Sequence, residues 1–194
     1  MKNILLITTL VFFSSCQPIV KTLAGVKNPK LENKERVKDY LVKANLDPQN
    51  NFIIKDKSSY QTVLDLFYKS FPEAILFDKD GNELIYKETT TSCNAGLFKV
   101  IPELGKNSEL KKGTHQLSQV LSDYTKPLDN NQIITDDSDY YLLINWAIFA
   151  GSLNKNHVLA WENIAKENKN SKIKVIKLNM DLQESWGLKK EDLK

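Results

Sequence analysis

The sequence is poor in the residues that build metal and redox sites. Its 194 residues include two cysteines, Cys16 and Cys93, and two histidines, His115 and His157, which lie far apart. A zinc site of the usual type needs several closely spaced Cys or His ligands, and no such cluster is present. A Ser/His/Asp order, a glycine-rich phosphate loop and an HExxH helix are also missing. We therefore expect neither a metal nor a cofactor.

A strong charge of one sign is missing as well. Lysine and arginine together number 27 against 24 aspartates and glutamates, which gives a net charge of +3. Arg36 is the only arginine, and lysine reads phosphates less well because it cannot bind them in a bidentate way. No lysine-rich run exceeds an ordinary solvated face, so we expect no nucleic acid partner. The hydrophobic fraction of 41% is typical of a globular protein.

The N-terminal residues have the order of a bacterial export signal. Lys2 gives a short positive region, and residues 4–13 form an apolar run that is too short for a permanent membrane span. Two serines then precede Cys16. This order resembles the signal peptide and lipobox of bacterial lipoproteins, although Phe13 stands where that family prefers Leu or Val. The alternative is an ordinary secretory signal in which Cys16 is incidental.

The lipoprotein resemblance has consequences for organisation and location. In that family the cysteine is acylated, with palmitate among its fatty chains, and becomes the first residue of the mature protein. Residues 1–15 are then the signal peptide, residues 16–31 the lipidated cysteine and its tether, and residues 32–194 a single domain. Two or more chains anchor firmly, because each buried methylene contributes roughly 0.8 kcal/mol. The resemblance implies a membrane-anchored protein of the bacterial cell envelope that faces the periplasm, on a membrane that the sequence does not identify.

Between residues 32 and 124 the spacing of apolar residues predicts alternating helices and strands. The expected helices cover residues 32–44, 60–67, 97–104 and 117–124, and the expected strands cover 52–54, 74–77 and 84–86. Asp80-Gly81 is the expected hairpin turn, and Thr114 the expected N-cap of the last helix. Pro102 should end the third helix near Ile101. Residues 125–139 should form a polar loop.

The final third has the clearest pattern. Tyr140 to Trp146 form a nearly continuous apolar run, which is typical of a strand covered on both faces. A helix is expected around residues 158–165 and a second strand at 173–178. A unit of this length predicts two parallel strands in the centre of a sheet, joined by a right-handed crossover.

Residues 143–154 and 172–181 resemble part of the thioredoxin family. In that family a strand ends in Trp-Ala, a Cys-Gly-x-Cys loop begins a helix, and the next strand ends near Asn-x-Asp. The matching residues are Trp146, Ala147, Gly151, Asn179 and Asp181. The two redox cysteines are absent, and Ala150 and Leu153 stand in their places.

A second resemblance lies upstream of the first. Residues 71–84 resemble the cis-proline strand and hairpin of thioredoxins, with Pro72 as the cis-proline. These elements precede the strand–helix–strand unit instead of following it, so the resemblance implies a permuted order. The expected fold class is α/β: a thioredoxin-like three-layer sandwich with a mixed sheet and flanking helices. Another three-layer α/β fold is the alternative.

Two functional classes fit these residues. The first is a non-catalytic binding or scaffold module whose partner is an envelope protein. The resemblance offers that partner's backbone one surface, which is formed by Pro72, Ala150, Gly151 and Ser152. The second is a thiol oxidoreductase or peroxidase-like enzyme that uses Cys93, whose thiolate a nearby helix N-terminus would favour. The missing second sulfur favours the first class and leaves the second open.

Two further groups have simpler interpretations. The acidic residues of 78–83 invite a calcium site, but Gly81 comes too early for an EF-hand loop, and we expect a polar turn. Trp146 and Trp161 lie in apolar runs and should belong to the core. Trp186, in a short terminal segment, is the tryptophan expected to be exposed.

Overall fold

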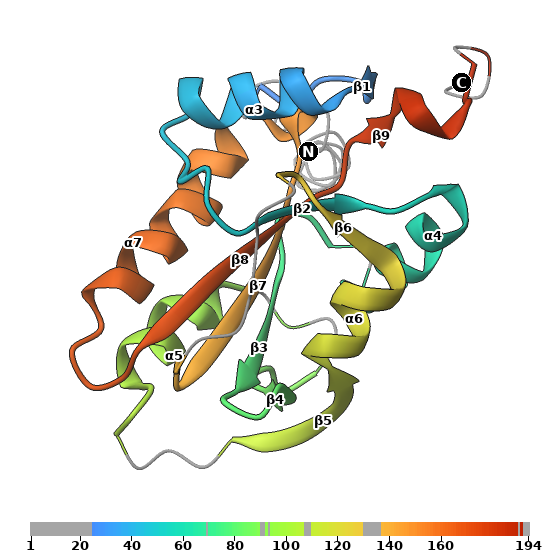
Figure 1. Cartoon of the computed structure of the whole chain (residues 1–194). Helices are drawn as coiled ribbons and strands as arrows, with labels where there is room; N and C mark the ends of the chain where they lie inside the picture. The colour runs from blue at the N-terminus through green and yellow to red at the C-terminus, as the bar shows by residue number, and fades with distance from the viewer. Residues whose placement is uncertain are drawn as a thin grey trace, which may run out of the picture.

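A mixed sheet of seven strands forms the middle layer of a three-layer α/β sandwich (Figure 1). The computed structural model describes residues 25–68, 70–89, 92, 94–106, 110–129, 137–189 and 191. The strand order is β5-β4-β3-β7-β8-β2-β6, and a separate two-stranded sheet pairs β1 with β9. The fold class expected from the sequence, an α/β sandwich with a mixed sheet and flanking helices, is confirmed.

The elements have the following bounds. The strands are β1 (Leu31–Glu32), β2 (Asn51–Ile54), β3 (Ala74–Asp78), β4 (Asn82–Ile85), β5 (Lys111–Gln116), β6 (Thr125–Pro127), β7 (Tyr140–Trp146), β8 (Ile173–Asn179) and β9 (Leu182–Gln183). The α-helices are α3 (Lys34–Lys43), α4 (Lys57–Leu66), α5 (Leu97–Glu103), α6 (Leu117–Tyr124) and α7 (Ala160–Glu167), and a π-helical segment, Asn154–Leu159, leads into α7.

Strand β7 lies in the centre of the sheet, as its apolar run predicts. It pairs antiparallel with β3, where Leu143 is opposite Ile75. It pairs parallel with β8 along its whole length, from Tyr140 opposite Ile173 to Trp146 opposite Asn179. The expectation of a parallel strand–helix–strand unit at 140–179 is therefore confirmed.

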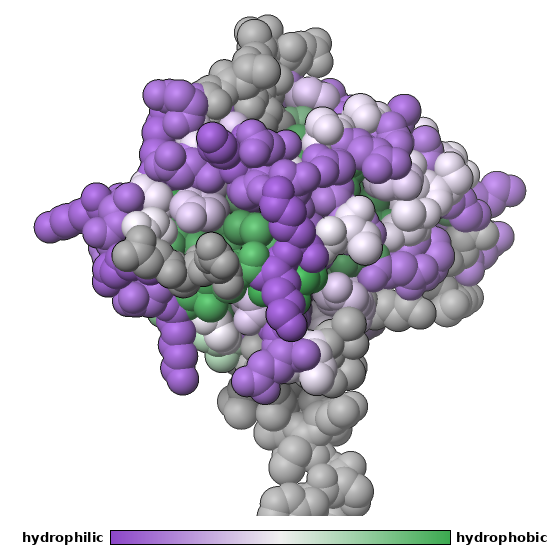
Figure 2. All heavy atoms as spheres, turned by 90° about the horizontal axis from the view of Figure 1, so that it is seen from below, coloured by the Kyte–Doolittle hydropathy of each residue, from purple (hydrophilic) through white to green (hydrophobic). Residues whose placement is uncertain are grey.

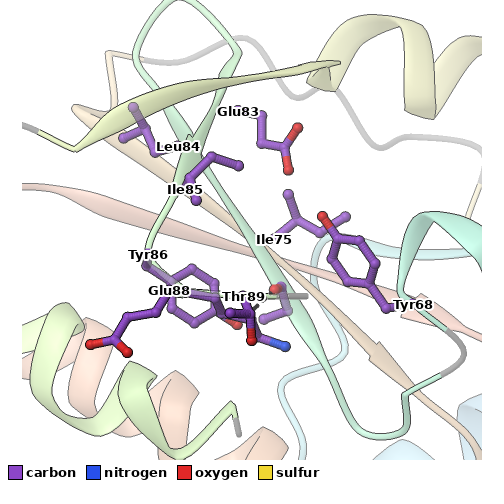
Figure 3. A pocket seen from close by; sticks show the side chains of 10 residues that line it. Tyr68, Ile75, Glu83, Leu84, Ile85, Tyr86, Glu88 and Thr89 are labelled. Carbon is purple, nitrogen blue, oxygen red and sulfur yellow. Dashed lines mark hydrogen bonds between the residues drawn. The ribbon is translucent and has the colours of Figure 1, made fainter. Parts of the chain in front are cut away.

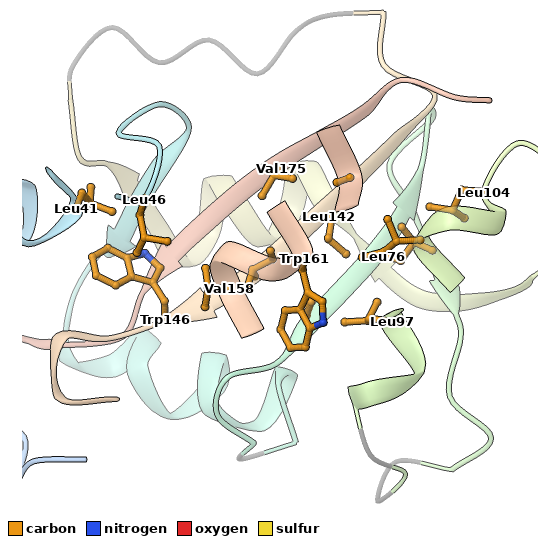
Figure 4. Packing of buried hydrophobic residues seen from close by; sticks show 14 of the residues in the cluster. Leu41, Leu46, Leu76, Leu97, Leu104, Leu142, Trp146, Val158, Trp161 and Val175 are labelled. Carbon is orange, nitrogen blue, oxygen red and sulfur yellow. The ribbon is translucent and has the colours of Figure 1, made fainter. Parts of the chain in front are cut away.

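Two apolar cores lie on the two faces of this sheet. One core packs the sheet against α3, α5 and α7 and contains Trp146 and Trp161, both fully buried (Figure 4). The other packs the sheet against α4 and α6 and contains Phe67 and Phe77. Full burial of one such side chain contributes about 1.5–3 kcal/mol or more. The expected core positions of Trp146 and Trp161 are confirmed.

The structure corrects the expectation for residues 111–116. They form the edge strand β5, so Thr114 does not cap a helix, and α6 begins after Gln116. The main-chain N–H groups of Thr114 and His115 donate to the buried carboxylate of Glu83 on β4, at 3.0 and 3.1 Å. A Cβ atom on Gly113 would lie 2.3 Å from that carboxylate, so a larger residue here would force the Glu83 side chain to move.

Two smaller expectations are also corrected. Residues 125–127 are strand β6, which pairs antiparallel with β2, and do not belong to a loop. Helix α5 runs through Pro102 to Glu103 and does not end near Ile101. Pro102 is tolerated because it lies in the last turn of a seven-residue helix.

Candidate functional site

The candidate site is the loop that follows β7 at the carboxyl end of the central strands. The chain leaves β7 at Trp146 and makes a 3₁₀ turn over Ile148–Ala150. It then passes through Gly151, whose φ of 58° is rarely adopted by other residues. The carboxamide Nδ2 of Asn154 closes the loop by donating to the Ala147 carbonyl oxygen at 2.8 Å. Trp146 packs beneath it against the ring of Tyr40 on α3.

A buried carboxylate holds this loop from below. Asp181 follows β8, is 1% exposed, and accepts the main-chain N–H of Ile148 at 2.7 Å. The Nδ2 of Asn179 donates to the same oxygen at 2.7 Å. Burial raises the pKa of Asp181 to about 6, although these hydrogen bonds favour its charged form. Asn179 and Asp181, matched earlier to the strand end of thioredoxins, thus act together on the loop.

The Phe71–Pro72 turn lies beside the loop on the neighbouring strand. Its peptide bond is cis, as the resemblance predicts. The main-chain N–H of Glu73 donates to Oδ1 of Asn145 at 2.6 Å, and the N–H of Asn145 donates to the Glu73 carbonyl at 2.9 Å. The ring of Phe71 stacks on that of Phe149, with 5.3 Å between centroids. The structure therefore brings two distant segments of the proposed surface together.

The four residues of the predicted binding surface differ in accessibility. Ser152 is exposed and Gly151 is half-buried, whereas Pro72 is buried and Ala150 is 1% exposed. The part that a partner can reach is therefore the edge of the loop at Gly151–Ser152. Ala150, in the place of a redox cysteine, points into the protein.

A segment that the sequence assigned to the tether lies against this loop. The main-chain N–H of Lys27 donates to the Phe149 carbonyl oxygen at 2.8 Å. Leu31 and Glu32 form β1, which pairs parallel with Leu182 and Gln183 of β9. A cavity of about 130 Å³ remains between residues 27–32, the loop and Asp181. The contact of Lys27 with Phe149 gives no side-chain pattern in the sequence, because it is a main-chain hydrogen bond.

A second pocket, of about 210 Å³, opens between Tyr68 and strand β4 (Figure 3). Next to it the Glu73 carboxylate, whose side chain is 2% exposed, accepts a hydrogen bond from Tyr86 at 2.9 Å and forms an ion pair with Lys87. The Lys87 ammonium lies 5.8 Å from the centroid of the Tyr68 ring. The pocket is apolar on its β3–β4 side, where its lining includes Ala74, Ile75, Leu84 and Ile85. Of its charged lining residues, Lys87 pairs with Glu73 and Glu83 accepts the N–H groups of Thr114 and His115. Sequence patterns gave no sign of this pocket.

A third cluster is a buried ion pair on the α7 side of the sheet. Lys177 on β8 and Glu162 on α7 are 3.2 Å apart, and their side chains are 1% and 2% exposed. Burial lowers the pKa of Lys177, and the charge of Glu162 opposes that shift. Lys166 reaches the same carboxylate from the surface at 3.1 Å. A cavity of about 420 Å³ borders the pair.

The remaining predicted positions divide into two groups. Cys16 and Cys93 lie outside the described residues.

In the hairpin at 78–83, the Asp78 carboxylate accepts the main-chain N–H groups of Asp80 and Asn82 at 3.0 and 2.8 Å, as in a polar turn. Within the described ranges, no group of three or more His, Cys, Asp or Glu residues could hold a metal ion.

The structure corrects the expectation that Trp186 is exposed. Trp186 is half-buried, because its ring packs edge-on against Tyr60 with centroids 5.7 Å apart.

Seen from the β4–β5 end, the surface shows apolar residues between projecting hydrophilic side chains (Figure 2). Among the described residues, no helix combines the length and hydrophobicity that crossing a membrane requires.

The chain matches no protein-family model, no curated protein sequence and no solved structure. The assignment of function therefore depends on the residues and geometry given above.

Proposed function

We propose that the protein is a lipid-anchored component of the bacterial cell envelope whose thioredoxin-like domain binds a partner without catalysing a reaction. The anchor is Cys16, and the domain faces the periplasm. The partner is an envelope protein that presents an extended segment to the loop after β7. Binding of this kind uses the segment's main-chain hydrogen bonds for affinity and its side chains for specificity.

The loop is the observation that carries the proposal. Its residue Phe149 stacks its ring on Phe71, beside Pro72, and offers its carbonyl oxygen as a main-chain acceptor. The positions expected to hold redox sulfurs carry Ala150 and Leu153. Such a loop can pair with a peptide backbone, but it cannot exchange a disulfide, because that chemistry needs a thiolate.

The sheet order supports the thioredoxin-like assignment. Strands β4, β3, β7 and β8 are consecutive in the sheet, with β3 antiparallel and β8 parallel to β7. This is the arrangement expected for a thioredoxin core in which the cis-proline hairpin precedes the strand–helix–strand unit. Fold likeness does not assign an activity by itself, so the argument for binding depends on the loop.

A cross-linking experiment tests the proposal. A photoreactive amino acid replaces Ser152 in the full chain, expressed in its native envelope, and a matched variant carries it at exposed Lys79 in the β3–β4 hairpin. We expect adducts at position 152 that map by mass spectrometry onto one segment of one envelope protein, and none of these at position 79. Adducts that are absent at 152, or scattered over many proteins at both positions, would contradict the proposal.

A second candidate function is one-cysteine thiol chemistry at Cys93. One observation favours it: the side chain of the next residue, Asn94, donates to the Pro72 carbonyl, so the chain at this point reaches the turn beside the loop. An insulin-reduction assay with dithiothreitol separates the two functions. The binding module gives the rate of the control without protein. Turnover that disappears in Cys93→Ser assigns the enzyme function instead.

A further inference from the structure

Residues 27–32 lie where the proposed partner segment would bind. The N–H of Lys27 already donates to the Phe149 carbonyl, which is the main-chain acceptor that the loop offers next to Ala150. Four residues further on, the same segment adds the short parallel strand β1 to β9. An extended stretch of this chain therefore makes contacts of the kind that a partner's backbone would make.

Side chains fix the far end of this segment. Glu32 is 8% exposed, and its carboxylate accepts from Nε of Arg36 at 2.7 Å. Arg36 also donates to the Leu31 carbonyl at 3.0 Å and to Glu184 beyond β9 at 2.5 Å. At the near end, the contact found within the described part of the chain is the Lys27 hydrogen bond, and the side chains of Lys27 and Lys30 are exposed. The segment is thus anchored at Glu32 and weakly attached at Lys27.

The segment also covers a buried group. Lys27, Asn28, Lys30 and Glu32 line one side of the 130 Å³ cavity, and Ile148, Phe149 and Asp181 line the other. Removing the segment would expose Asp181 and the Phe149 carbonyl to water. The Phe149 carbonyl would lose its Lys27 partner, whereas Asp181 would keep its hydrogen bonds to Ile148 and Asn179.

We propose that residues 27–32 close the binding surface of the loop in cis, and that a partner's extended segment must displace them to bind. This inference rests on the proposed function and names the regulation of that site. A two-residue ladder is marginal on its own, so the closure is readily reversed. A competitor in trans needs a high concentration, since a short covalent link gives the cis segment an effective concentration in the millimolar range.

Two substitutions of Lys27 provide a matched test in the full chain. Lys27→Pro removes the N–H that binds Phe149, whereas Lys27→Ala keeps it and removes only the exposed side chain. Hydrogen exchange followed by mass spectrometry reports opening of the segment. We expect the amides of Leu31, Glu32 and Ile148 to exchange about fivefold faster or more in the proline variant than in the alanine variant, as one lost hydrogen bond implies.

Binding is measured with a fluorescent synthetic peptide of residues 25–33 as the probe. We expect its Kd to be about fivefold lower or more for Lys27→Pro than for Lys27→Ala and the unsubstituted protein. Equal affinity for all three proteins, or no binding to a proline variant that exchanges faster, overturns the inference. In the unsubstituted protein, millimolar unlabelled peptide should speed exchange at Glu32, and no change there also overturns it. This measurement on the unsubstituted protein does not depend on whether the Lys27 variants fold.

Closure by residues 27–32 and binding of a partner at the loop can fail independently of each other. If the peptide binds Lys27→Pro while position 152 forms no specific adduct, the closure stands and the proposed partner function fails. If position 152 forms its adduct while the peptide never competes, the binding function stands and the closure fails.

Discussion

The carboxylate of Asp181 accepts the main-chain N–H of Ile148 at 2.7 Å, and this bond joins the end of β8 to the loop after β7. The two residues are far apart in the chain, but each follows the end of one of two neighbouring parallel strands, β7 and β8. The bond therefore helps to fix the shape of the loop. Burial of the same carboxylate raises its pKa and so makes the stability of the protein depend on pH.

Asp181→Asn should flatten the dependence of stability on pH. The folded-state pKa of Asp181 is raised from 3.8 to about 6, so its stabilising contribution is fully present below pH 3.8 and is lost as pH rises through 6. A shift of this size corresponds to about 3 kcal/mol at most. Between pH 4 and 7.5, the free energy of urea unfolding should fall in the unsubstituted protein. Asp181→Asn should lack this fall, and the surface control Asp80→Asn should retain it. An identical slope in Asp181→Asn would show that another group is responsible.

The buried pair of Lys177 and Glu162 should be strongly coupled. Glu162→Leu leaves the Lys177 ammonium buried without its partner, and we expect a loss of about 3 kcal/mol in unfolding free energy. Adding Lys177→Met should recover most of this loss, because an apolar pair of similar volume then fills the site. Urea titrations of the two single variants and the double variant give the coupling energy. Additive effects would mean that the two charges do not interact.

Gly113→Ala should destabilise the β4–β5 edge. The new Cβ would lie 2.3 Å from the Glu83 carboxylate, which must move and release the N–H groups of Thr114 and His115. We expect a loss of about 1–3 kcal/mol. Ser118→Ala, at an exposed position on α6, is the control and should have little effect on the unfolding free energy. If Gly113→Ala leaves the urea midpoint unchanged, the Glu83 side chain does not occupy this space in solution.

Cys16→Ala tests the anchor independently of the fold. In the native host, the substitution should move the protein from the membrane fraction to the soluble fraction and remove the mass of the lipid. Cys93→Ala is the matched control and should leave both the fraction and the lipid mass unchanged. A Cys16→Ala protein that stays in the membrane fraction would contradict the lipoprotein proposal.

The sequence predicts the centre of this fold better than its edges. The β7–α7–β8 unit follows from long apolar runs, because burial on both faces leaves a pattern in the residues. Strand β5 is largely polar and β6 has three residues. Both are joined to the sheet by main-chain pairing, which depends little on the side chains, so neither gives a periodic signal.

The same physical reason explains what could be predicted of the site. The Phe71–Pro72 turn and the Gly151 loop carry recognisable residues, and the structure brings them together through Phe71 and Phe149. The contact of Lys27 with Phe149 uses main-chain atoms and leaves no pattern. The partnership of Lys177 with Glu162 depends on how α7 packs on β8, which residue spacing alone does not specify.

The central claim is that the loop after β7 binds an extended segment and that residues 27–32 compete for it. The most direct measurement is the yield of the cross-linked partner at position 152 in the native envelope, compared between Lys27→Pro and Lys27→Ala at equal expression. The account predicts a severalfold higher yield in the proline variant, because its loop is open more of the time. An equal or lower yield in the proline variant would contradict it.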